Sequence, residues 1–121
     1  MKQTSELDEL AKNFVIPQRS GVYLAKSEII VLANLSDGSL RVNERSRMLA
    51  DVLKSPSSPR DLSALVGRLG AFCAMHVDWM EAVVSTWPAL AGPLENARAR
   101  AIHTQQTLAD LQEEILWEES E

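Results

Sequence analysis

The sequence predicts an all-α protein, a four- or five-helix bundle built on a long antiparallel helical hairpin. Two long stretches carry apolar residues at alternating steps of three and four, which is the spacing of one helix face. A proline-rich turn joins these stretches, so the two helices are expected to pair as a hairpin. Hydrophobic residues make up 45% of the chain but aromatic residues only 5%, which indicates an aliphatic helical core.

The first residues predict a short helix. Thr4 or Ser5 can cap it, acidic side chains follow in its first turn, and apolar residues continue at helical spacing as far as Phe14. This helix should end before Pro17, because proline disfavours a helical conformation in the residue before it. Residues 18–21 are expected to form a loop.

The segment 22–42 allows two interpretations. The β-branched run at residues 29–31 favours a strand, and residues 36–38 could form the turn of a small β-hairpin. The polar start at residues 27–28, followed by Ala and Leu, favours a helix instead. Because a lone pair of strands is only marginally stable, we prefer the helix and keep the β-hairpin at 22–42 as the alternative.

A third helix is expected to begin after Asn43, which can cap it, with its apolar stripe within 48–53. The linker at 54–59 holds two prolines and three serines and cannot continue a helix. It is too short to separate domains. The chain is therefore expected to be a single helical domain over 1–121, with 114–121 as an acidic tail prone to fraying.

The two long helices are expected at Pro59–Trp87 and Pro93–Glu118. Ser58 can cap the first, and proline suits its first helical position. The apolar side chains of this first long helix cover a wide arc, because a second row of apolar residues, which includes Trp79, overlaps the first row. Neighbouring helices are therefore expected to cover this helix on more than one side.

The formal net charge is −5, and the last 21 residues hold six acidic side chains and no Lys or Arg. A chain of this sign is a poor general binder of nucleic acid or of anionic membranes. The sequence has no signal-peptide core, no run that could cross a bilayer and only one cysteine. We therefore expect a cytoplasmic protein with no membrane association.

Cys73, His76 and Met80 share one helix face, a soft ligand set that suits Cu(I) or haem iron. Cys and Met are also ordinary core residues, and one helix cannot close a coordination shell. We therefore expect no metal and no cofactor here. No serine lies in a nucleophile-elbow or phosphate-loop motif, so we also expect no enzymatic activity.

The predicted function is binding to another, unidentified protein, as a small bacterial-type accessory, adaptor or inhibitor protein that forms a homodimer. There are two alternatives. One is a nucleic-acid-associated regulator that uses the basic cluster Arg41–Arg68, and the other is a metal or haem carrier that uses Cys73, His76 and Met80. The predicted partner-binding residues are Trp117, Glu114, Glu118, Glu119, Arg41, Arg45 and Arg47. The predicted oligomer interface consists of small residues that let helices approach closely, namely Gly67, Ala71, Ala74, Ala97 and Ala101.

Overall fold

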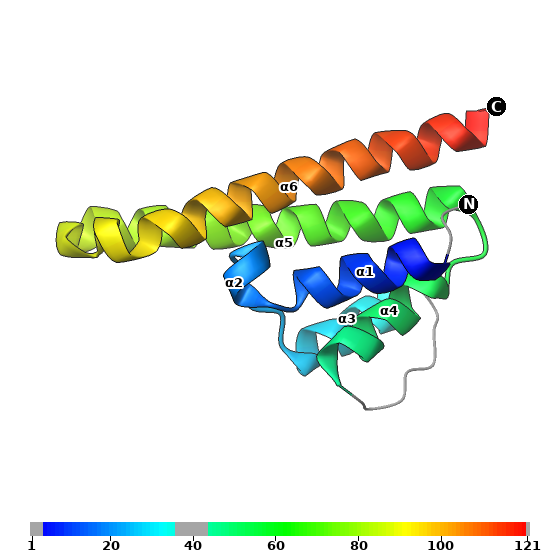
Figure 1. Ribbon diagram of the computed structural model, residues 1–121, viewed down its shortest axis with the longest axis horizontal. Helices are drawn as coiled ribbons and strands as arrows, with labels where there is room; N and C mark the ends of the chain where they lie inside the picture. Colours follow the sequence, from blue (N-terminus) through cyan, green and yellow to red (C-terminus); the bar gives the residue numbers. More distant parts are fainter. Residues whose placement is uncertain (1–3, 36–43, 121) are drawn as a thin grey trace.

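The computed structural model describes residues 4–35 and 44–120, and all regular structure within them is helical (Figure 1). The prediction of an all-α fold is therefore confirmed for this part of the chain. The elements are α1 (Thr4–Phe14), α2 (Pro17–Ser20), α3 (Lys26–Leu35), α4 (Arg45–Lys54), α5 (Pro59–Thr86), the 3-10 helix η1 (Pro88–Leu90) and α6 (Ala91–Ser120).

The long helices α5 and α6 lie side by side over much of their length and form a hairpin-like pair (Figure 1). Near η1, Arg98 of α6 donates to Glu81 of α5 over 2.7 Å. Farther from η1, Gln112 Nε2 donates to the carbonyl of Ser63 over 3.0 Å. The short helices cover only the part of the hairpin that is remote from η1, so the η1 end projects beyond them (Figure 1).

The boundaries of α5 follow from its end residues. The Ser58 side chain accepts from the backbone N–H of Asp61 over 3.2 Å, as an N-cap does. Pro59 takes the first helical position and Pro88 follows the last turn, so the predicted span is confirmed to within one residue. The helix α6 begins at Ala91, two residues earlier than predicted, because Pro93 lies in the first turn, where no intrahelical N–H bond is required.

The N-terminal part differs from the prediction at one place. The loop expected at 18–21 is largely the single helical turn α2, which Pro17 starts and Gly21 ends. Gly21 adopts the left-handed conformation with φ 79°, and its N–H donates to the Pro17 carbonyl over 2.9 Å. The sequence pattern that indicates this short helix is the proline at its start together with the glycine at its end.

The preference for helix in the segment 22–42 is confirmed over Lys26–Leu35, and the described residues 22–35 contain no strand. The Glu28 carboxylate accepts from the N–H of Ala25 over 3.0 Å and so stabilises the start of α3. Residues 36–43 lie outside the described part, and with them the expected cap Asn43. The structure places Glu44 at the N-cap of α4.

The core fills the space between the short helices and the hairpin. The helices α1 and α4 pack against each other, and α2 packs on α6. No helix in the described residues is long and apolar enough to span a membrane. The largest fully buried side chains are those of Phe14, Leu24, Ile29, Met48, Leu49, Leu53, Leu62, Leu69, Leu108 and Ile115.

Candidate protein-binding surface

All three tryptophans of the chain lie on the hairpin and are exposed. The exposed fractions are 62% for Trp79 in α5, 61% for Trp87 at the end of α5 and 67% for Trp117 in α6. Neighbouring helices contact α5, but they do not cover the part of its wide apolar arc that holds Trp79. The short helices pack on one side of the hairpin and leave its η1 end uncovered (Figure 1).

A mostly apolar groove lies between α3 and α5, here called the α3–α5 groove. Its volume is about 290 Å³. Val31 of α3 and Met75 of α5 line it and are 57% and 68% exposed. Trp79 is one helical turn beyond Met75 and extends this apolar surface along α5. Val31 and Met75 are far apart in the sequence and lie beside one groove only in the folded chain, so no local sequence pattern indicates the groove.

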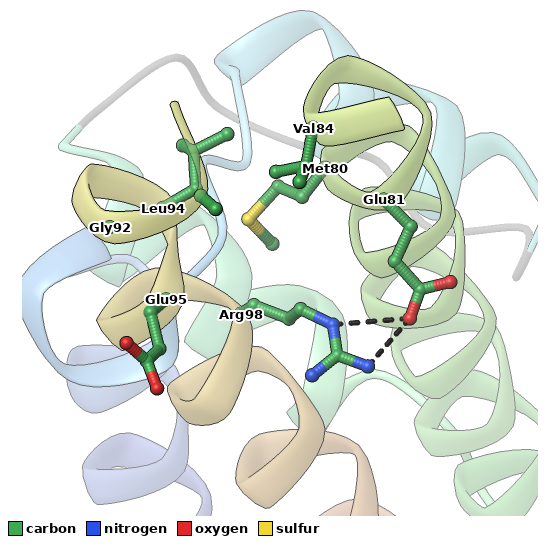
Figure 2. A pocket seen from close by; sticks show the side chains of 8 residues that line it. Met80, Glu81, Val84, Gly92, Leu94, Glu95 and Arg98 are labelled. Atoms are coloured by element: carbon green, nitrogen blue, oxygen red, sulfur yellow. Dashed lines mark hydrogen bonds and ion pairs between the residues drawn. The ribbon is translucent and has the colours of Figure 1, made fainter. Parts of the chain in front are cut away.

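A second hollow, the hairpin-end cleft, lies between α5 and α6 beside η1 (Figure 2). Met80, Val84 and Leu94 form an apolar lining, and the volume is about 510 Å³. Figure 2 shows Arg98 reaching across to Glu81, whose Oε1 accepts from Nη2 over 2.7 Å and from Nε over 3.1 Å. Both side chains are nearly half exposed, so this ion pair contributes little to stability.

The acidic tail predicted to carry the partner site continues α6 as far as Ser120. Ile115 is buried at 1% exposure, whereas Trp117 points away from the core. These two side chains therefore lie on different sides of α6. Glu114 and Glu118 are exposed, and the side chain of Glu119 is outside the described part.

The two predicted basic residues that the structure describes, Arg45 and Arg47, differ in exposure. Arg45 is half-buried, because its Nη1 donates to the Leu24 carbonyl over 3.2 Å and its guanidinium lies 4.4 Å from the centre of the Tyr23 ring. This arginine therefore stabilises the segment before α3. Arg47 is exposed, and Arg41 lies outside the described residues.

Four of the five small residues predicted at an oligomer interface lie at contacts within the chain. Gly67 and Ala74 line the seam between α5 and α6, and a Cβ atom added at Gly67 would lie 2.8 Å from Gln112 Nε2. Ala101 is fully buried and Ala97 is half-buried, both beside the end of α2. Ala71 is the exposed member, and it lines both the α5–α6 seam and the α3–α5 groove.

The Cys73 face is part of the core. Cys73 is fully buried, and burial raises the pKa of its thiol from 9.0 to about 12. Met80 is 3% exposed, and the His76 ring packs on Phe72 with centroids 4.3 Å apart. Within residues 4–35 and 44–120, His, Cys, Asp and Glu side chains form no group of three or more able to hold a metal ion.

Comparison of the chain with known protein families, curated proteins and solved structures gives no match.

Proposed function

We propose that this protein acts without catalysis, by binding another protein through the exposed surface of its hairpin. The observation that carries the proposal is that all three tryptophans are more than 60% exposed, with Trp79 in α5, Trp117 in α6 and Trp87 at the junction between α5 and η1. A single exposed hydrophobic residue needs no explanation, but tryptophan contributes disproportionately to the energy of protein interfaces. An indole removed from water on binding buries a large apolar area, of roughly 150–250 Å² when fully covered.

In this proposal the two long helices run antiparallel and form a rigid extended hairpin. The short helices pack on the part of the hairpin that is remote from η1. The hairpin would present tryptophans at three separate places, each of which could contact a partner protein. The chain would therefore act as an accessory, adaptor or inhibitor protein in the cytoplasm. The homodimer expected from the sequence belongs to the same proposal.

The end of α6 is the proposed docking site for the unidentified partner. Leu116 and Trp117 are 44% and 67% exposed and are surrounded by glutamates in the sequence. An apolar anchor within an acidic surface suits a partner with an apolar groove and a basic rim. The glutamates would speed the encounter by long-range attraction, and Trp117 would supply most of the affinity.

Affinity capture from the source cells tests this proposal with two matched variants. Trp117→Ser removes the proposed anchor, and Trp87→Ser makes the same change at the other end of the hairpin. We expect at least one protein to be retained by the wild type and by Trp87→Ser and lost with Trp117→Ser. Circular dichroism should show unchanged helix content in both variants. An identical set of captured proteins for Trp117→Ser and the wild type would refute the tail as a docking site.

A further inference from the structure

We propose that a second copy of this chain docks on the outer face of α5, with Trp79 of each copy in the α3–α5 groove of the other. This inference rests on the proposed protein-binding function and names the partner of one of its surfaces. The outer face is defined as the exposed row Arg68, Ala71, Met75, Asp78, Trp79 and Ala82.

The outer face lies away from the core side of the same helix. Leu69, Cys73 and Met80 point into the core at 1%, 0% and 3% exposure. Met75 and Trp79 lie on the opposite side of α5, at 68% and 62% exposure. Helical spacing places Ala71, Met75 and Asp78 in one row, with Trp79 beside it. The outer face is therefore an apolar strip with the positive charge of Arg68 near one end and the negative charge of Asp78 near the other.

The shape of the outer face fits its own copy. If two α5 helices pack antiparallel about a two-fold axis at Met75, each Met75 meets its equivalent and each Trp79 lies opposite Ala71 of the other copy. A large side chain thus faces a small one. The groove beside Ala71 has a volume of about 290 Å³, just below the roughly 300–1,000 Å³ of small-molecule pockets. It therefore suits one large side chain from a neighbouring molecule.

The charges on the outer face are also self-complementary. In the same register Arg68 faces Ala82 of the other copy, with Asp78 of that copy one helical turn away. The two-fold axis repeats this pairing, so the dimer would gain two ion pairs. Within the part of the chain that the structure describes, neither Arg68 nor Asp78 forms an ion pair. Glu28 also lines the groove, but its carboxylate accepts from the Ala25 N–H at the start of α3.

The length of the outer face predicts a dimer of modest affinity. The row from Arg68 to Ala82 covers about 21 Å of helix at 1.5 Å per residue. With Ile30 and Val31 of α3 alongside, it supplies an interface at or below the usual size of roughly 800 Å² per partner. The dimer should therefore dissociate on dilution, which makes its dissociation constant measurable.

Light scattering over a series of concentrations measures this equilibrium. The wild type should pass from the mass of one chain to that of two as concentration rises. Trp79→Ser should raise the dissociation constant at least about tenfold, because it removes the side chain that fills the groove. Trp87→Ser is the matched control and should leave the constant unchanged. A wild type with the mass of one chain at every concentration, or a dimer lost with Trp87→Ser but retained with Trp79→Ser, would overturn the proposal.

A charge exchange tests the register independently. Arg68→Glu places like charges near Asp78 of the other copy, and Asp78→Lys places like charges near Arg68, so each variant alone should dimerise at least about tenfold more weakly. An equimolar mixture should form a heterodimer, because both pairings are then between opposite charges. A misfolded variant would not recover on mixing. A mixture that associates no better than either variant alone would overturn the register.

These outcomes are separate from those of the partner-capture experiment. A monomeric wild type overturns self-docking through α5 and leaves the result for Trp117 unchanged. Conversely, a Trp117→Ser variant that captures the same proteins as the wild type refutes the tail site. That result has no bearing on the mass that light scattering measures for the wild type.

Discussion

Gly21 lies so close to Ala101 that α2 and α6 nearly touch through their backbones. A Cβ atom added at Gly21 would be 2.5 Å from the Ala101 nitrogen and 2.4 Å from the Ala97 carbonyl oxygen. The Thr104 hydroxyl donates to the Ser20 carbonyl over 2.8 Å and holds the same contact. This close approach explains the small side chains of Ala97 and Ala101, whose spacing in the sequence had predicted a contact between two copies.

Gly21→Ala should therefore destabilise the fold by about 2–4 kcal/mol, since it adds strain at a positive φ and forces the backbone of α6 away. Gly70→Ala is the control, because an added Cβ there meets nothing within 4 Å and lies inside α5. That change should stabilise the protein by roughly 0.5–1 kcal/mol. Urea denaturation measures both effects, and equal free energies of unfolding for the two variants would contradict the contact.

Ser58→Ala should reduce the free energy of unfolding by about 1 kcal/mol, because the N–H of Asp61 loses its capping partner. Ser57→Ala, one residue earlier and exposed, should have almost no effect. Thermal melts of the two variants provide the comparison. An equal loss of unfolding free energy in Ser57→Ala would show that Ser58 is not the residue that caps α5.

Ile115 and Trp117 should respond oppositely to truncation. Ile115→Ala should cost about 2–5 kcal/mol, because it leaves a cavity at a position that is 1% exposed. Trp117→Ser should leave the free energy of unfolding within about 0.5 kcal/mol of the wild type, as exposed substitutions do. Chemical denaturation measures both values. A large loss in Trp117→Ser would place this indole in the core and refute its docking role.

The buried thiol predicts a pH dependence in alkaline solution. Above pH 9 the unfolded chain loses the Cys73 proton, whereas the native state keeps it until the pH approaches about 12. The unfolded state then binds fewer protons, so stability present below pH 9 is lost as the pH rises towards 12. Cys73→Ala should show a smaller decrease over this range, because it lacks the thiol. Identical pH profiles of unfolding free energy in the two proteins would contradict the assignment.

The long helices could be predicted because their signals are local. Ser58 and Pro59 define the start of α5, Pro88 follows its end, and the apolar row continues through every turn. The direction of Trp117 was also predictable, because two residues after buried Ile115 a helical side chain points elsewhere. These features need no knowledge of distant contacts.

The exposed surface could not be predicted in the same way. Periodicity places Trp79 on an apolar arc, but only the folded chain shows that the short helices leave that side uncovered. The α3–α5 groove joins Val31 to Met75, which are far apart in the sequence. For the same reason the small residues Gly67 and Ala101 pointed to an interface between copies, although their neighbours Gln112 and Gly21 belong to the same chain.

Chemical cross-linking at residue 75 tests the docking of two copies most directly. Met75→Cys would place one accessible thiol per chain on the proposed two-fold axis, while Cys73 is buried and its pKa is raised to about 12. With a short bis-maleimide, we predict rapid linkage of two chains, slowed by the added change Trp79→Ser. Ala64→Cys, exposed elsewhere on α5, is the control. If Met75→Cys cross-links no faster than Ala64→Cys, the outer face of α5 does not meet its copy.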